Sequence, residues 1–253
     1  MNKLYKLLPA AVLSLCVLAG AGFGQNETPE QIVDRASQAY NRQWEGNTIK
    51  DYVGSGKVTL TGNSDGPLDF YLAANKDRRV KFTVTAPNGS KLISLGTDQT
   101  KSWYVSGLFS AEATGNAAHF IDNHIDRSIA QLFDKHNTLV DLGPADLQHA
   151  PESVSSRVIK STSKKGVTAN YYIDNTTSLI SRIEFETGNS YTMLFSAQQL
   201  PALAAFVLSN YQNVDGVPTP FRIGVYEGLT KIEELSFTSM QYNTGIKNKE
   251  FVP

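Results

Sequence analysis

Cysteine is almost absent from this chain of 253 residues, and the only one, Cys16, lies within the first 24 residues. The rest of the chain therefore has no thiol that could form a disulfide, act as a nucleophile or bind a metal as a thiolate. Disulfide scaffolds, cysteine enzymes and cysteine-ligated metal sites are excluded for that part.

Concentrated positive charge is also missing. The chain has 23 lysines and arginines against 24 aspartates and glutamates, and its densest basic stretches are residues 78–81 and the pair Lys164 and Lys165. A protein that binds nucleic acid presents a basic face to the phosphates. We therefore expect no nucleic acid partner.

The motifs of the main enzyme classes are missing as well, since no nucleophile elbow, phosphate-binding loop or dinucleotide fingerprint is present. Residues 161–164 match the S-x-x-K pattern, but they lack its companion motifs, and a turn before Gly166 is the simpler interpretation. His119 and His124 stand five residues apart, so on a helix they would not share a face that binds a metal.

Two pairs of carboxylates are candidates for catalytic groups, Glu184 with Glu186 and Glu233 with Glu234. Both pairs lie in strand-like segments and are interpreted as solvated groups on the outside of a sheet. We expect a protein that is not an enzyme and that holds neither a metal nor a cofactor.

The first 24 residues resemble an export signal. Lys3 and Lys6 form a basic start, residues 7–20 are apolar, and Gly22 and Gly24 are the small residues that a signal peptidase reads. We predict a signal peptide over residues 1–24 and a periplasmic protein. A retained anchor is the alternative, while a lipoprotein acylated on Cys16 is disfavoured because that cysteine lies inside the apolar run.

Residues 25–253 contain no linker and no repeat, which predicts a single domain. It begins with a helix, because residues 28–31 read Thr-Pro-Glu-Gln, a capping box with proline at the first helical position. Apolar residues then recur at helical spacing up to Trp44.

Most of the chain after residue 50 alternates apolar with polar residues, the pattern of strands with one buried face. Turn signals such as Asn88-Gly89 and Asp215-Gly216 separate these segments. About eleven strands in sequence order predict an antiparallel meander. Residues 200–208 are apolar on nearly all sides and are compatible with either a buried helical turn or a strand.

The strand pattern lapses for about 45 residues within 106–153. There, apolar residues at helical spacing predict an amphipathic helix over residues 117–135. Its apolar stripe comprises Ile121, Ile125, Ile129, Leu132 and Phe133. Two interpretations stay open, a helix packed on the core and a movable lid.

Three segments resemble the periplasmic carrier family of outer-membrane lipoproteins, with the related outer-membrane receptor and lipoprotein-sensing regulator. They are residues 79–104, which include RVKF and GTDQTKSWY, residues 172–183 (YIDNTTSLISRI), and residues 210–222 (NYQNVDGVPTPFR) with the closing EFVP. The resemblance implies an α+β fold, an incomplete, half-open antiparallel β-barrel with an N-terminal helix and a helical lid. It also implies a hydrophobic cavity for acyl chains, and Arg79 as the arginine that locks the lid.

The resemblance and the alternating strands together predict an exported, monomeric protein that binds acyl chains of lipids or lipoproteins, with a possible protein partner in the envelope. A role in outer-membrane lipoprotein sorting is the expected use. The predicted cavity residues are Phe70, Leu72, Val80, Phe82, Val84, Trp103, Val105, Ile183, Phe185, Phe221, Ile223 and Val225. Each could equally be an ordinary core residue, and an interaction protein, scaffold or lipid sensor whose concave face is filled by its own side chains is the alternative.

Overall fold

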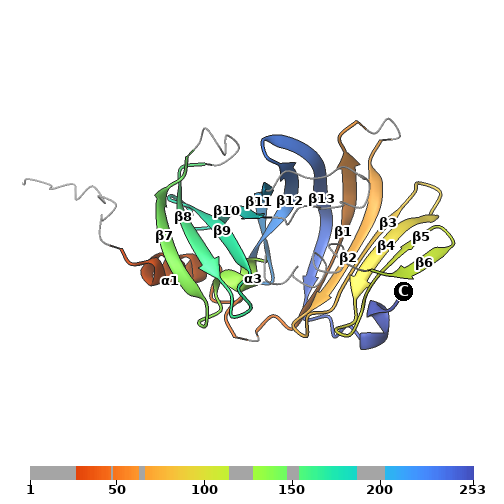
Figure 1. Cartoon of the computed structure of the whole chain (residues 1–253), viewed down its shortest axis with the longest axis horizontal. Coiled ribbons are helices and arrows are strands. Elements are labelled where there is room, and N and C mark those ends of the chain that lie inside the picture. The colour runs from red at the N-terminus through yellow and green to blue at the C-terminus, as the bar shows by residue number, and fades with distance from the viewer. Residues whose placement is uncertain (1–26, 47, 63–65, 114–127, 147–153, 187–202) are drawn as a thin grey trace, which may run out of the picture.

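A single antiparallel sheet of thirteen strands dominates the computed structural model, which describes residues 27–46, 48–62, 66–113, 128–146, 154–186 and 203–253 (Figure 1). The strands are β1 (Asp51–Leu60), β2 (Leu68–Asn75), β3 (Val80–Thr85), β4 (Lys91–Thr97), β5 (Ser102–Ser106), β6 (Phe109–Glu112), β7 (Thr138–Pro144), β8 (Ser156–Thr162), β9 (Thr168–Asp174), β10 (Ile180–Glu186), β11 (Leu203–Val214), β12 (Val217–Glu227) and β13 (Thr230–Tyr242).

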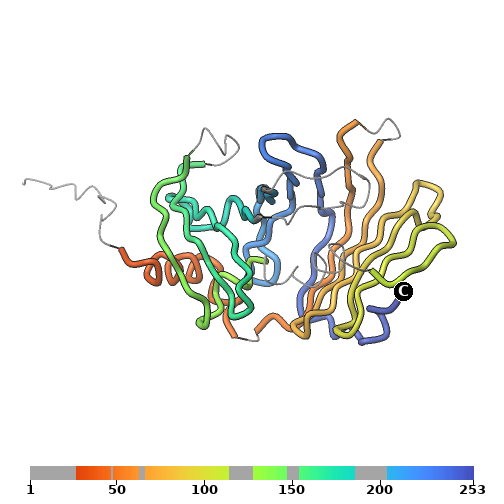
Figure 2. The backbone as a smooth tube through the Cα atoms, in the orientation of Figure 1, coloured from red at the N-terminus to blue at the C-terminus, as the bar shows by residue number. Residues whose placement is uncertain are grey.

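The strand order is β6-β5-β4-β3-β2-β1-β13-β12-β11-β10-β9-β8-β7. Every neighbouring pair is consecutive in the sequence except β1 and β13, so the expected meander runs outward in two directions from this junction. The edge strands β6 and β7 lie at opposite ends of the long axis (Figures 1 and 2). The connection between β6 and β7 therefore joins the two edges of an open sheet.

The junction of β1 with β13 depends on glycine. Gly56 lies at a register shift between β1 and β13. A Cβ atom at this position would meet the backbone of Ser236 and Phe237. Because only glycine lacks that atom, it allows the two strands to approach at the bulge.

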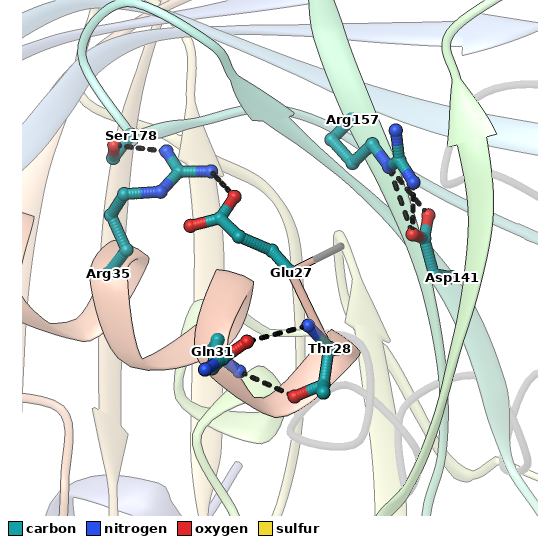
Figure 3. Close-up of polar contacts among 7 residues, drawn as sticks. All are labelled: Glu27, Thr28, Gln31, Arg35, Asp141, Arg157 and Ser178. Atoms are coloured by element: carbon teal, nitrogen blue, oxygen red, sulfur yellow. Dashed lines mark hydrogen bonds and ion pairs between the residues drawn. The ribbon is translucent and has the colours of Figure 1, made fainter. Parts of the chain in front are cut away.

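The predicted N-terminal helix is confirmed as α1 (Pro29–Ala39). Thr28 caps it as expected: its hydroxyl oxygen accepts a hydrogen bond from the Gln31 amide, and its own amide donates to Gln31 Oε1 at 2.8 Å (Figure 3). The described part of the second predicted helix is one short turn, α3 (Ile129–Leu132), which ends before residue 135. A 3-10 turn, η2 (Asn248–Phe251), closes the chain.

The structure has two strands, β6 and β7, within the stretch for which sequence predicted no strands. Both are edge strands, and the residues of β7 alternate only between partly exposed and exposed, with none buried. The ambiguous stretch at 200–208 belongs to strand β11 from residue 203 onward. Residues 191–196, whose sequence also predicts a strand, lie outside the described residues.

Candidate ligand-binding face

One face of the sheet, which we call the inner face, carries apolar side chains from one half of the sheet to the other. The register can be followed across five strands by the pairs Ile183 with Phe206, Phe206 with Val225, Val225 with Glu233, and Glu233 with Leu60. Directly paired residues lie on the same side of a sheet. The inner face is therefore continuous from β10 to β1.

Ten of the twelve predicted cavity residues lie on the inner face. Phe70 pairs with Val84, Leu72 pairs with Phe82, and Val80 pairs with Ala74 beside them. Beyond the β1–β13 junction, Ile183, Phe185, Phe221, Ile223 and Val225 occupy alternate positions of β10 and β12. The alternation predicted from sequence therefore brings these ten side chains to one face.

Trp103 and Val105 lie on the opposite, outer face. Tyr104, between them, pairs with Leu95, which itself pairs with the inner-face residue Phe82. The Trp103 indole donates a hydrogen bond of 3.0 Å to the carbonyl oxygen of Phe251. The C-terminal turn thus buries this tryptophan on the outer face, and Tyr104 takes the inner position in its strand.

Helices cover the inner face over β8 to β11. Ile32, Val33, Ala36 and Tyr40 from α1 pack there with Leu132 from α3. Their partners are strand residues such as Ile159, Tyr171, Ile183 and Phe185. This region, which we call the covered half, is an apolar core built from helix and strand residues together.

Buried tyrosines fix the end of α1 on the covered half. The Tyr40 and Tyr211 hydroxyl groups are 2.8 Å apart, and Tyr211 donates to the carbonyl oxygen of Ile180 at 2.6 Å. The amide of Ile180 donates in turn to the Tyr40 hydroxyl. Burial raises the pKa of both tyrosines well above the usual value, so both remain neutral hydrogen-bonding groups.

Polar contacts anchor the start of α1 (Figure 3). The Arg35 guanidinium donates to the Ser178 hydroxyl at 2.6 Å and pairs with Glu27 at 3.4 Å. Nearby, Arg157 of β8 and Asp141 of β7 form a two-pronged ion pair, and hydrogen bonding to Arg157 lowers the pKa of Asp141. The Arg35 contact thus ties α1 to the turn between β9 and β10, and the Arg157 pair joins β8 to the edge strand β7.

Of the predicted lid residues, Leu132 is buried in the covered half, and Ile129 and Phe133 pack against it. The Phe133 ring meets the Tyr40 ring edge-on at 5.7 Å. Ile121 and Ile125 lie outside the described residues. The described part of the stripe is thus packed on the core, and its movement as a lid stays a prediction.

The inner face over β1 to β4, β12 and β13, which we call the strand-only half, is built differently. No described helix residue belongs to its apolar cluster. Its buried members are Val58, Leu68, Phe70, Val84, Ile93, Phe221 and Phe237. Several side chains around them keep part of their surface accessible: Leu60, Leu72, Phe82, Val214, Ile223, Leu235 and Met240.

A carboxyl group lies on the inner face beside this cluster. Glu233 of β13 pairs with Leu60 on one side and Val225 on the other, and only 6% of its surface is exposed. Burial raises its pKa to about 7. The sequence-based interpretation of Glu233 as a solvated residue is wrong, because its position opposite Leu60 turns it to the apolar side.

Glu184 is likewise buried, on the outer face, contrary to its interpretation as a solvated group. It accepts hydrogen bonds of 3.1 and 3.2 Å from Arg182, which is 1% exposed, and the Arg182 guanidinium lies 5.7 Å from the centre of the Tyr172 ring. A buried charge pair of this kind is held by mutual hydrogen bonds and has no exposed group for chemistry. Glu234 keeps the predicted outward position, with Lys231 and Arg222 as partners.

Arg79 interacts with the neighbouring turn. Its guanidinium donates to the carbonyl oxygen of Asp98 at 3.2 Å and to the side chain of Gln99 at 2.9 Å. Of residues 161–164, Ser161 and Thr162 end strand β8, and the predicted turn before Gly166 begins at Ser163, whose hydroxyl oxygen accepts a hydrogen bond from the Val167 amide. Among the residues that the structure describes, no histidines and acids gather in threes as a metal site would require, and no helix has the length and apolar character to cross a membrane.

Comparisons with known proteins identify the fold. No protein-family profile and no curated protein sequence matches the chain. Among solved structures, a LolA superfamily protein from Nitrosomonas europaea is similar at 14% identity and a TM-score of 0.54, over 90% of this chain and 99% of that one. A DUF1329 family protein from Desulfovibrio piger matches at 12% identity and a TM-score of 0.54, over 90% and 98% of the two chains.

A third similar structure is a domain from Vibrio parahaemolyticus that is named for outer membrane lipoprotein sorting. It is 10% identical, with a TM-score of 0.52, and the match covers 88% of this chain and 97% of that one. Matches of this extent at such low identity establish a shared architecture. The chain therefore shares the open antiparallel sheet fold of these three structures, one of which belongs to the LolA superfamily.

Proposed function

We propose that this is an exported, non-catalytic protein that binds the acyl chains of lipids or lipoproteins on the strand-only half of its inner face. The observation that carries the proposal is the contrast between the two halves. Apolar side chains line the face throughout, but described helices cover only one half. Leu72, Phe82 and Leu235 keep accessible apolar surface in the other half.

An accessible apolar surface binds hydrocarbon because binding removes apolar groups of both from water. Each methylene group removed from water contributes about 0.8 kcal/mol, so a chain of about twelve carbons offers a gross gain of roughly 10 kcal/mol. Association and chain ordering offset several kcal/mol of this gain. The expected result is binding in the micromolar range that depends on chain length.

Export and lipoprotein sorting complete the proposal. Residues 1–24 have the organisation of a signal peptide, and one protein of the same fold is named for outer membrane lipoprotein sorting. A periplasmic acyl-binding protein would shield acyl chains from water in that compartment. We place this protein among such carriers, with lipid or lipoprotein as its cargo.

The test is titration of the delipidated protein, purified from cells that express the whole sequence, with a fluorescent fatty-acyl probe. Leu72→Asp places a charge on the inner face of β2 and should weaken binding about tenfold or more. The reason is that a bound acyl chain would remove water from the new carboxylate. Tyr71→Asp is the matched control, since Tyr71 lies next to it on the outer face and is 37% exposed. Equal binding by both variants, or no binding by the unmodified protein, would contradict the proposal.

A protein-docking role is the second candidate, and exposed apolar residues on the edge strands favour it. Val140 and Leu142 on β7 are 46% and 51% exposed, and Phe109 on β6 is 59% exposed. An edge strand can pair with an extended segment of a partner. Native mass spectrometry separates the two candidates: co-purified lipid supports carriage, and a lipid-free protein that captures an envelope protein supports docking.

A further inference from the structure

Glu233 is an unusual group to find on the inner face. It pairs with Leu60 and Val225, and the next residue on its own side of β13, Leu235, belongs to the apolar cluster. The neighbouring Glu234 points to the outer face, where Lys231 and Arg222 bind its carboxylate. The two adjacent glutamates therefore have opposite environments: cations surround the carboxylate of Glu234, and apolar side chains surround that of Glu233.

No described residue forms a hydrogen bond or an ion pair with the Glu233 carboxyl group. Burying such a group without a partner is costly, and folded proteins nearly always satisfy it. Loss of solvation on burial raises the pKa of Glu233, and no nearby cation among the described residues counteracts this rise. The described part of the fold thus surrounds the Glu233 carboxyl group with apolar side chains and offers it no protein hydrogen-bond partner.

The charges around Glu233 favour one sign of ligand. No lysine or arginine shares the inner face of β1, β12 or β13, because Lys57, Arg222 and Lys231 of these strands lie on the outer face. Glu227 is the second carboxylic acid on the inner face of these three strands, and it pairs with the inner-face residue Ala204. Burial raises the pKa of Glu227 as well. An amphiphile bound here meets carboxyl groups and hydrocarbon.

We propose that Glu233 is a headgroup-binding residue, and that the strand-only half accepts a lipid with a primary amine, whose ammonium group donates hydrogen bonds to the Glu233 carboxylate while its hydrocarbon chain covers the apolar cluster. This inference rests on the proposed function and adds a specificity to it. A charge-assisted hydrogen bond supplies the missing partner of the acid. An anionic headgroup would bring like charges together.

The experiment compares amphiphiles of one chain length in competition with the fluorescent acyl probe at a mildly basic pH. Dodecylamine carries the ammonium group, dodecanol has a neutral hydroxyl group, and dodecanoate is anionic. In the unmodified protein we expect dodecylamine to compete about tenfold better than dodecanol, since a hydrogen bond to a charged group is worth about 1.5 kcal/mol or more. Dodecanoate should be the weakest competitor.

Two variants test whether Glu233 causes the preference for dodecylamine. Glu233→Gln keeps the size of the side chain and removes its charge, and it should reduce the preference for dodecylamine over dodecanol to about twofold or less, with dodecanol affinity unchanged. Glu234→Gln alters the adjacent acid on the outer face and should keep the full preference. Thermal unfolding of both variants confirms that they fold.

The outcomes separate this inference from the proposed function. If the three amphiphiles compete equally, or if the preference for the amine survives Glu233→Gln, the headgroup role is wrong while acyl binding stands. If none of them displaces the probe because the probe itself does not bind, the proposed function fails, and the headgroup role fails with it.

Discussion

The covered half and the strand-only half use the same alternation of side chains for different ends. In the covered half, α1 and α3 supply Ile32, Tyr40 and Leu132 to complete a core with the strands. In the strand-only half, the described cluster contains strand residues alone, and Glu233 lies beside it without a described partner. One half is organised for stability, and the other keeps features that suit a ligand.

The junction of β1 with β13 should be the most sensitive position. In Gly56→Val, the new side chain would collide with the backbone of Ser236 and Phe237, which cannot move without separating β1 from β13. We expect a loss of roughly 3 kcal/mol or more in the free energy of unfolding, measured by urea denaturation followed by circular dichroism. Thr59→Val, on the exposed side of the same strand, serves as the control and should change stability little.

The covered half should respond to cavity formation. Ile32→Ala removes a side chain of α1 that is 2% exposed, and it should lower the free energy of unfolding by about 2 to 4 kcal/mol. Because Ile32 does not belong to the strand-only half, the affinity for an acyl probe should stay within about twofold in protein that remains folded. A large loss of affinity at full folding would show that the two halves are not separate in function.

Glu233 predicts a dependence of stability on pH. Burial raises its pKa from 4.5 to about 7, so the folded protein binds this proton more tightly than the unfolded chain does. The corresponding stability is present below about pH 4.5 and is lost as pH rises through about 7. Between about pH 5 and pH 8, the unmodified protein should lose up to roughly 3 kcal/mol relative to Glu233→Gln.

Urea denaturation across this pH range provides the measurement, with Glu234→Gln as the control. Hydrogen bonding to Lys231 lowers the pKa of Glu234, so its contribution has the opposite sign and is lost as pH falls. Glu227 faces the same side as Glu233 and has a raised pKa as well, so some loss with rising pH should persist in Glu233→Gln. Parallel curves for the unmodified protein and Glu233→Gln would contradict the buried position of the acid.

The smallest effect on stability should come from a partly exposed residue on the inner face of the strand-only half. Leu72→Ala truncates a partly exposed side chain, so it should lower the free energy of unfolding by only about 1 kcal/mol. It should nevertheless lower the affinity for the acyl probe several-fold, because the ligand would cover the apolar surface that is lost. A stability loss as large as that of Ile32→Ala, with unchanged binding, would instead indicate an ordinary core residue.

The sequence predicted those elements whose boundaries are set by local residues, such as helix caps and turns. The capping box at Thr28 and the hairpin turn at Asp215-Gly216 need no tertiary information, and both are present. Strand β11 was ambiguous because apolar residues such as Ala204 and Ala205, which point to opposite faces, are both buried. Period-two alternation disappears when both faces of a strand are covered.

The site was predictable in part for the same reason. Alternation placed ten apolar residues on one face, but it could not show that the C-terminal turn covers Trp103 on the other. The sequence pattern does not single out Glu233, because the adjacent Glu234 makes the pair resemble solvated residues of a strand. Counting positions from Leu235 would have placed Glu233 on the apolar side, so the missing signal was strand parity.

The most direct test of the central claim is quenching of an introduced tryptophan by a brominated fatty acid. Phe82→Trp places the indole on the inner face of the strand-only half, and Tyr71→Trp places it on the outer face of the adjacent strand. We predict that the brominated chain quenches the added fluorescence of Phe82→Trp at saturation and leaves that of Tyr71→Trp unchanged. Equal quenching of both, or of neither, would contradict acyl binding on the inner face.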